Sequence, residues 1–535
     1  MRALVFLLVL LHLATAGDTD LSRVEAYIHQ RLNITTVSPA PMGTCGFEDQ
    51  LNLRTHFSQL PAHLQRLAKQ LIVKPVRQDS MLSPKGHFML HYDTLGYHAV
   101  PLADQSGNGI PDYVDSAAVY LEHAWDVEIN ELGFHPPPDA HGRPIDHYPV
   151  YFTNFGFYGV TNFDLKDDIL ELPGNNYPSY LELNNDFYNT GFYTTGLAAM
   201  KVTCAHEFNH AIQLGYNFRV VNYGYPDVFF MEMTSTWLED FVYNSVNDYY
   251  QYLTNFFPHI DRYPFNQADG NSEYANSIYL HMLAKLYGPK IVPAIWQKIN
   301  DYPAVDAINA ALMQKGSNFA LSQNRYAVWV YFTGNRADPQ KFFTEGAQYP
   351  QIYLNSDMDN LTQSLTQLHM RHGKTYVDKN YIYAAKISAS SNNGYCNHIN
   401  NGQANHGPVS FNQTQIFNQR PDVPLIIVLT NPTQESINDI TYSLNLAPLG
   451  VGSNPMRVKN KGDKITFYNM PPRSVLSVFT VNGRLVSRIR NDQNDVQNIE
   501  WDLRDRLGGT LHSGVYLYYL KSGDGSYPGK FTLVR

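Results

Sequence analysis

The spacing of apolar residues changes along the chain and divides it into a mainly helical part and a strand-rich part. Apolar residues at three- and four-residue steps predict helices over 24–32, 60–73, 277–287, 291–298, 304–315 and 327–332. Short apolar runs predict strands over 88–92, 148–152 and 179–183. After about residue 353 the chain alternates between apolar and polar residues, with Asn, Gly, Pro and Gln turns, which is typical of a β-sandwich.

A further apolar stripe predicts a buried helix near the middle of the chain. Leu197, Met200, Cys204 and Phe208 recur at three- and four-residue steps, as the core-facing residues of a helix do. We therefore expect all four side chains to face the core.

The same helix carries His206, Glu207 and His210 in the sequence HExxH. Four residues make slightly more than one helical turn, so both imidazoles project from one face and can bind one metal ion. Glu207 lies beside that position and is placed to take a proton from a bound water. The alternative is a pair of surface histidines on an ordinary helix, which fits poorly with the apolar flanks.

A third metal ligand is expected in the helix predicted over 230–240. HExxH followed about twenty residues later by the helical Glu232 resembles the gluzincin metallopeptidases, which include thermolysin-like enzymes and zinc aminopeptidases. Trp237 and Glu239, five and seven residues after Glu232, match the aminopeptidase branch. The resemblance implies a zincin-like domain in which Glu232, and not Glu239, binds zinc. Thr236 replaces the aspartate of the thermolysin pattern, so the residue that orients the histidines stays open. A solvated helix acid is the alternative role for Glu232.

The resemblance also implies a mechanism. Zinc held by His206, His210 and Glu232 activates a water molecule, and Glu207 acts as the general base. Gluzincins add a tyrosine or histidine that stabilises the oxyanion. Tyr274 is the candidate, with Tyr279 and His281 as rivals, and 38 tyrosines leave many alternatives.

A second metal site is expected in the loop from Asp104 to Asp115. Its sequence fits a twelve-residue calcium loop, with a glycine at position six and a backbone carbonyl at position seven. The predicted calcium ligands are Asp104, Ser106, Asn108, Ile110, Asp112 and Asp115. Aspartate replaces the usual glutamate at position twelve, and proline stands at position eight. An Asn-Gly turn before an acidic helix start is the alternative.

The beginning of the chain and its composition indicate a secreted globular protein. A short basic start, an apolar run over 3–13 and Ala14-Thr15-Ala16 predict a signal peptide over 1–16. No later stretch approaches eighteen uninterrupted apolar residues, so we expect no transmembrane segment. A hydrophobic content of 44% with 16% charged residues is globular, and 535 residues suggest about three or four domains. A net charge of -9 gives no reason to expect nucleic acid as a partner.

The three cysteines suggest different roles. Cys204 is expected to be a buried apolar residue next to the zinc motif. Cys45 lies in Cys-Gly-Phe-Glu-Asp, which is similar to the cysteine switch of matrix metalloprotease pro-segments, where a thiolate blocks the fourth zinc position. The similarity implies that Cys45 is an inhibitory zinc ligand. A disulfide between Cys45 and Cys396 is the alternative.

The last part of the chain, from about residue 447, has its own pattern. Strand-like runs over 465–472 and 476–483 precede Ser513-Gly514-Val515-Tyr516 and a final apolar run over 529–535. This resembles the C-terminal sorting domain of type IX secretion, an Ig-like sandwich. The resemblance implies contact with secretion machinery, and a generic Ig-like domain is the alternative.

Together these features predict a multidomain α+β protein with a zincin-like (gluzincin) domain followed by β-sandwich and Ig-like domains. We expect an N-terminal pro-segment over 17–85, a zinc metallopeptidase domain over 86–352, a β-sandwich over 353–446 and an Ig-like domain over 447–535. The expected function is that of a secreted or surface-attached zinc endopeptidase that cleaves proteins or peptides and is stabilised by calcium.

Two other functions are compatible with the sequence. One is a catalytically inactive adhesin on the same scaffold, which the intact Glu207 disfavours. The other is an aminopeptidase. That activity needs an acidic anchor for the substrate amine upstream of HExxH, but the corresponding stretch here, 184–187, is Asn-Asn-Asp-Phe.

Overall fold

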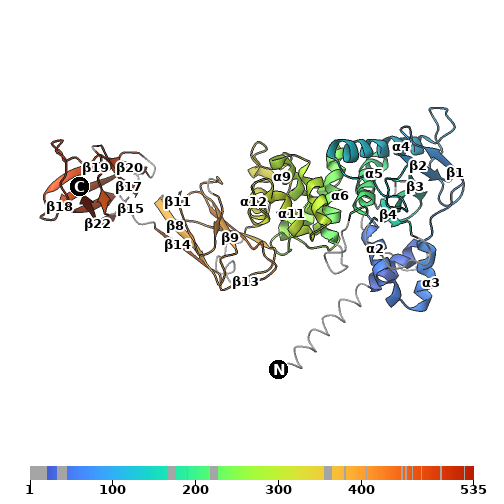
Figure 1. Ribbon diagram of the computed structural model, residues 1–535, viewed down its shortest axis with the longest axis horizontal. Helices are drawn as coiled ribbons and strands as arrows, with labels where there is room; N and C mark the ends of the chain where they lie inside the picture. The colour runs from blue at the N-terminus through green and yellow to red at the C-terminus, as the bar shows by residue number, and fades with distance from the viewer. Residues whose placement is uncertain are drawn as a thin grey trace, which may run out of the picture. The chain divides into compact units, whose positions relative to one another are not determined.

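The computed structural model describes residues 21–32, 45–165, 176–188, 191–216, 227–354, 364–378, 381–404, 407–446, 450–451, 455–460, 462–471, 473–493, 497–522 and 525–535. The chain divides into two compact units, residues 1–322 with 329–352 and residues 323–328 with 353–535. It is a mixed α/β, multidomain protein with several β-sheets in its C-terminal half (Figure 1). The expected signal peptide lies outside the described residues.

The first unit is built on a five-stranded sheet with the order β1-β2-β3-β5-β4. Its strands are β1 (Asp79–Leu82), β2 (Phe88–Tyr92), β3 (Tyr148–Thr153), β4 (Gly159–Phe163) and β5 (Ser179–Asn184). The parallel neighbours β2, β3 and β5 agree with the predicted strands within one residue. The antiparallel edge strands β1 and β4 were not predicted. The sheet therefore begins at residue 79, inside the segment that the sequence assigned to the pro-segment.

Two helices, α4 (Asp112–Trp125) and α5 (Gly196–Gln213), pack against this sheet and against each other (Figure 1). The ring of Phe208 on α5 lies 5.1 Å from Phe88 and 5.5 Å from Trp125, between sheet and helix. Met200, Cys204 and Phe208 are fully buried, as predicted. Leu197 is 42% exposed, so the prediction for this residue is wrong. It lies in the first turn of α5, at the end of the predicted stripe.

The helices that follow cover the other side of α5. The next one, α6 (Val228–Val242), packs directly on α5, and α8 and α9 pack on α6. The remaining helices are α7 (Tyr250–Phe256), α8 (Ser272–Ala275), α9 (Ser277–Tyr287), α10 (Ile291–Ile299), α11 (Ala304–Met313) and α12 (Phe319–Tyr331). The predictions for α9, α10 and α11 agree within two residues, but α12 begins eight residues earlier than predicted. The Asn318 side chain accepts a hydrogen bond from the Leu321 N–H and so caps its start.

The N-terminal segment is helical, as expected, and packs on the sheet. It consists of the helix over 21–31, α2 (Phe47–His56), η1 (Phe57–Gln59) and α3 (Ala62–Leu71). Its apolar side chains form a small core that includes Phe157 and Val160 from the region of β4. Arg31 reaches into the sheet and forms a buried ion pair with Glu182 on β5, at 2.7 Å. The segment is thus held to the sheet by both apolar contacts and a buried charge pair.

The second unit contains two β-rich parts. Its first part comprises β6 (Ser364–Leu365), β7 (Met370–Thr375), β8 (Tyr381–Ser388), β9 (Tyr395–Ile399), β10 (Val409–Ser410), β11 (Thr414–Gln419), β12 (Leu425–Thr430), β13 (Ile437–Asn438) and β14 (Thr441–Leu446). Strand β12 is fully buried and lies between β9 and β7 in its sheet. Cys396 is buried in the core of this part.

The C-terminal part has a core of its own, formed by two sheets with the orders β15-β17-β20 and β16-β22-β21-β18-β19. Its strands are β15 (Gly450–Val451), β16 (Met456–Arg457), β17 (Ile465–Met470), β18 (Ser474–Thr480), β19 (Leu485–Asn491), β20 (Gln497–Trp501), β21 (Gly514–Ser522) and β22 (Gly525–Val534). Among the described residues of the whole chain, no helix is long and apolar enough to cross a membrane.

Candidate metal centre

The predicted metal ligands of α5 and α6 face one another in the interior of the first unit. His206 Nε2 lies 3.1 Å from His210 Nε2 and 3.2 Å from Glu232 Oε2. The distance from His210 Nε2 to Glu232 Oε2 is 3.4 Å. His210 and Glu232 have no exposed surface, and His206 is 4% exposed. The packing of α6 against α5 therefore brings together the three residues that the sequence placed about twenty positions apart.

Cys45 is the fourth member of this cluster. Its Sγ lies 3.5 Å from His210 Nε2, and one donor atom from each of the four residues lies within 4.8 Å of the others. Within the described parts of the chain this is the one group of three or more His, Cys, Asp or Glu side chains that meets this criterion. The Cys45 and His210 side chains are far apart in sequence and meet only because the N-terminal segment docks on the sheet.

The donor set and its spacing fit a metal ion such as zinc. Four tetrahedral ligands at about 2.0–2.3 Å from zinc would lie about 3.3–3.8 Å from one another, close to the observed separations. The second carboxylate oxygen of Glu232, Oε1, is buried and has no hydrogen-bond partner among the described residues. Two imidazole nitrogens, a carboxylate and a thiol directed at one buried point form a donor set that a bound cation would stabilise. The cluster could therefore hold a metal ion.

Two side chains orient the histidines from behind. His206 Nδ1 lies 2.6 Å from Glu239 Oε1, and His210 Nδ1 lies 2.9 Å from Gln213 Oε1. Each oxygen accepts the Nδ1–H of its histidine, which leaves both Nε2 lone pairs directed into the cluster. The sequence pattern had singled out Glu239 without giving it this role. Nothing in the sequence pattern had pointed to Gln213.

Gln213 is itself held by a buried polar network. Its Nε2 donates to Asn209 Oδ1 at 2.6 Å and to the Met231 carbonyl at 2.9 Å. Asn209 in turn donates to Glu128 Oε2 at 3.2 Å, and burial raises the pKa of the Glu128 carboxyl well above its usual range. Fixed partners on every side keep the Gln213 carbonyl aimed at His210.

Glu207 lies between the cluster and strand β4. Its Oε2 accepts a hydrogen bond from Thr161 Oγ1 at 2.7 Å, and the same hydroxyl lies 2.9 Å from the Glu207 carbonyl. A Cβ on Gly159 would lie 2.5 Å from Glu207 Cγ and 2.8 Å from Thr203 Cγ2. Only glycine at this position lets the edge strand approach the helix so closely. Gly159 and Thr161 were both missed from the sequence, because β4 was not predicted.

Tyr274 is the one oxyanion candidate whose ring stacks on a cluster residue. Its ring lies 6.3 Å from the His206 ring, and it is 3% exposed. Burial raises its pKa far above the usual range, and the charges of Glu232 and Cys45 raise it further. The rivals have other contacts, since the Tyr279 hydroxyl bonds to Ser322 at 2.7 Å and His281 lies 3.9 Å from Asp240.

The thiol of Cys45 is held at the start of α2. The Phe47 N–H points at Cys45 Sγ across 3.3 Å, and Gly46 N donates to the Gly159 carbonyl at 3.1 Å. Cys45 thereby forms a parallel β-bridge with Gly159 on the open edge of β4. Burial raises the pKa of the Cys45 thiol, and the carboxylates of Glu207 and Glu232 raise it further. A thiolate here consequently depends on a bound cation.

All three cysteines of the chain are free in the structure. Cys45 lies at the cluster in the first unit, whereas Cys396 is buried in a hydrophobic core of the second unit. The alternative of a disulfide between them is therefore not what the structure shows.

The predicted calcium loop precedes α4 and is exposed. Asp104 accepts the N–H groups of Gly107 and Asn108 at 2.8 and 3.2 Å through Oδ1, and that of Gly109 at 2.9 Å through Oδ2. Asp112 Oδ2 accepts from Gln105 N, and Asn108 Nδ2 donates to Asp115 Oδ2, both at 2.9 Å. Asp104, Ser106, Asn108 and Ile110 lie in the loop, whereas Asp112 and Asp115 lie in the first turn of α4. Its carboxylates mainly accept hydrogen bonds from the loop itself.

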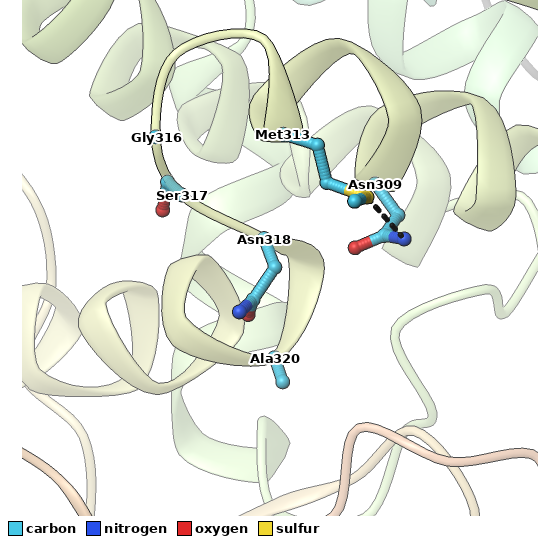
Figure 2. A pocket seen from close by; sticks show the side chains of 6 residues that line it. All are labelled: Asn309, Met313, Gly316, Ser317, Asn318 and Ala320. Atoms are coloured by element: carbon cyan, nitrogen blue, oxygen red, sulfur yellow. Dashed lines mark hydrogen bonds between the residues drawn. The ribbon is translucent and has the colours of Figure 1, made fainter.

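Two cavities differ sharply in their chemistry. One of about 10 Å³ adjoins the cluster, is lined by Tyr158, Val202, Thr203, Glu239 and cluster residues, and has room for about one water molecule. A second, of about 460 Å³, lies between the end of α11 and the start of α12 (Figure 2). Asn309, Met313, Gly316, Ser317, Asn318 and Ala320 line it. None of these side chains titrates, so this larger cavity offers no acid, base or metal ligand.

No model of a known protein family matches the sequence, and no curated protein matches it. Solved structures give weak likenesses. Aminopeptidase A of Legionella pneumophila is 10% identical over 68% of this chain and 36% of that chain, with a TM-score of 0.28. PorZ, a surface component of the type IX secretion system of Porphyromonas gingivalis, is 20% identical over 16% of this chain and 11% of its own, with a TM-score of 0.15.

Latent PorU from the same bacterium is 17% identical over 31% of this chain and 18% of that chain, again with a TM-score of 0.15. This chain thus spans a little over one third of the aminopeptidase and less than one fifth of the two secretion proteins. Likenesses this weak are no evidence for the activity of this protein.

Proposed function

We propose that this chain is the latent form of a secreted, zinc-dependent endopeptidase. The observation that carries the proposal is the convergence of His206, His210, Glu232 and Cys45 on one buried point. Three of these donors come from α5 and α6, and the fourth comes from the N-terminal segment. Three fixed protein ligands with a fourth position left for exchange are what a catalytic zinc site requires.

Each residue at the site then has a defined task. A zinc ion held here would supply Lewis-acid activation of a water molecule and of the substrate carbonyl. Glu207 would serve as the general base and acid at such a site, and Thr161 fixes the Glu207 carboxylate. Tyr274 provides a neutral hydroxyl, since burial keeps its pKa high, and such a donor can stabilise negative charge on the carbonyl oxygen.

Cys45 keeps the enzyme inactive in this proposal. Its sulfur takes the position that water needs, and the backbone next to it occupies the open edge of β4. An extended substrate adds to such an edge by strand pairing, so the segment blocks both the metal and the binding strand. Proteolytic removal of the segment frees both at once.

Internal cleavage is favoured over aminopeptidase action by the stretch 184–187. Asn184 Nδ2 donates to the carbonyls of Phe155 and Phe157 at 2.8 and 2.7 Å, and Asn185 Nδ2 donates to the Ala99 carbonyl at 2.7 Å. Asp186 Oδ1 accepts from the Tyr188 N–H at 3.0 Å. These hydrogen bonds hold a turn and engage Asp186, the one acid of the stretch, through Oδ1.

Two further predictions from the sequence accompany the proposal. Calcium binding at residues 104–115 would stabilise the loop before α4, and the C-terminal domain would bring the protein to the cell surface through secretion machinery. Both rest on the sequence resemblance alone.

The test is hydrolysis of an unfolded protein by the full chain after limited proteolysis of its N-terminal segment. We expect cleavage that stops with a zinc chelator and falls about a hundredfold to ten-thousandfold in Glu207→Gln. The exposed Glu131→Gln on the same unit serves as a matched control and keeps full activity. Cleavage that persists in Glu207→Gln contradicts the proposal. Absence of cleavage by the zinc-loaded, processed protein does so as well.

A further inference from the structure

Phe47 is buried at the metal cluster although it belongs to the N-terminal segment. It follows Cys45 by two residues and has no exposed surface. Its ring lies parallel to the ring of His210, with centroids 4.2 Å apart and an interplanar angle of 14°. Phe163, the last residue of β4, lies on another side at 6.4 Å and 28°. The side chain thus fills a space bounded by a metal ligand and the edge strand.

The surroundings of this space are aromatic once the segment is gone. Phe163 is fully buried and packs against Tyr177 with ring centroids 5.5 Å apart. One charged group near Phe163 is Arg54, whose guanidinium lies 6.0 Å from the ring. Arg54 belongs to α2 and leaves together with Phe47. The walls that stay behind, His210 and Phe163, favour a large apolar side chain.

The path of the segment indicates which part of a substrate reaches this space. Cys45 pairs with Gly159 and runs parallel to β4, so Phe47 lies toward the Phe163 end of the strand. A substrate that pairs with β4 in the slightly more stable antiparallel direction has its amino-terminal half at that end. Its carboxyl-terminal half lies at the Gly159 end, where the cavity of about 10 Å³ has little room.

We infer that the space occupied by Phe47 is a substrate subsite that selects an aromatic or large aliphatic side chain on the amino side of the scissile bond. Phe47 holds this subsite in the latent protein while Cys45 holds the metal. The inference rests on the proposed peptidase function and adds the substrate class to it.

The first test maps cleavage sites. The full chain, processed at its N-terminal segment and loaded with zinc, digests a mixture of denatured proteins, and mass spectrometry locates every cut. We expect Phe, Tyr, Trp, Leu or Met at one of the two positions before the cut. In matched fluorogenic peptides, kcat/KM should be at least about tenfold higher with Phe than with Ala at that position.

The outcomes separate this inference from the proposed function. Chelator-sensitive cleavage without such enrichment, or with enrichment on the carboxyl side, overturns the subsite and leaves the peptidase intact. Absence of chelator-sensitive cleavage overturns the peptidase itself.

A second test uses the segment as an inhibitor. A synthetic peptide of residues 45–56 should inhibit the processed protein, and Phe47→Ala in that peptide should weaken inhibition at least about tenfold. Glu48→Gln is the matched control, because Glu48 bonds to Arg23, which this peptide lacks. Its inhibition should match that of the natural sequence. Equal inhibition by the Phe47→Ala peptide contradicts a subsite at Phe47.

Discussion

The two predicted metal sites differ in how their oxygen, nitrogen and sulfur atoms are satisfied. In the cluster of Cys45, His206, His210 and Glu232, the donor atoms are buried and face one another, and Glu232 Oε1 has no described partner. In the loop of residues 104–115, the Asp104 carboxylate accepts three backbone N–H groups and faces solvent. In the cluster one buried carboxylate oxygen has no described partner, which favours a bound cation, whereas the exposed loop satisfies the Asp104 carboxylate with its own backbone.

The largest expected difference between the two sites appears when one carboxylate is removed from each and the zinc affinities of the two variants are compared. Zinc-site free energies of about 10–16 kcal/mol over four ligands correspond to about 3 kcal/mol each, or about a hundredfold in affinity. We expect Glu232→Gln to lower zinc affinity by at least that factor and Asp104→Asn to leave it unchanged. Competition with a chromophoric chelator measures both. Equal zinc affinity in the two variants would show that Glu232 is not a ligand.

Substitution of Glu239, which bonds to His206 Nδ1, should give the next largest loss of zinc affinity. Glu239→Gln keeps the size of the side chain but removes the charge that fixes the His206 Nδ1–H, and we expect about a tenfold loss of zinc affinity. Glu131→Gln is the control, because Glu131 is exposed and belongs to the same unit. The same competition assay should find zinc affinity unchanged in this variant. A loss equal to that in Glu239→Gln would point to general destabilisation instead.

Substitution of Cys45 distinguishes a cluster that only binds metal from one whose activity Cys45 blocks. In the unprocessed chain, we expect Cys45→Ser to raise basal cleavage of an unfolded protein about tenfold, since serine is a much poorer zinc ligand. Cys396→Ala, in the other unit, should leave it unchanged. X-ray absorption at the zinc edge should find one sulfur ligand at about 2.3 Å in the natural protein and none in Cys45→Ser. A sulfur signal that survives the substitution would rule out Cys45 as the ligand.

The smallest expected effect is that of added calcium on thermal stability. If the loop binds calcium, adding it at a hundred times its dissociation constant would stabilise the protein by about 2.7 kcal/mol at most, seen as a rise of a few degrees in Tm. Asp112→Asn should abolish this rise while leaving the zinc-dependent part of Tm intact. If calcium has no effect on the Tm of the natural chain, the loop is only the turn that its hydrogen bonds already form.

The sequence by itself determined the elements that depend on local spacing. HExxH on a helix sets two imidazoles on one face because the helical repeat does so. Short runs rich in apolar residues likewise marked the parallel strands β2, β3 and β5. The alternating pattern after residue 353 likewise predicted the sheets of the second unit. Leu197 was misplaced because a periodic stripe does not tell where packing ends.

Only the tertiary structure decided what reaches the cluster from elsewhere in the chain. Strand β4, with polar residues and an initial glycine, has no clear strand pattern, yet it places Gly159 and Thr161 against Glu207. Gln213 orients His210 through a network that joins α5, α6 and η2 (Asp126–Leu132). Cys45 and Phe47 reach His210 because the N-terminal segment docks on the sheet through apolar contacts and the Arg31–Glu182 pair. Such contacts depend on which surfaces bury one another, and the spacing of residues within a single element does not reveal this.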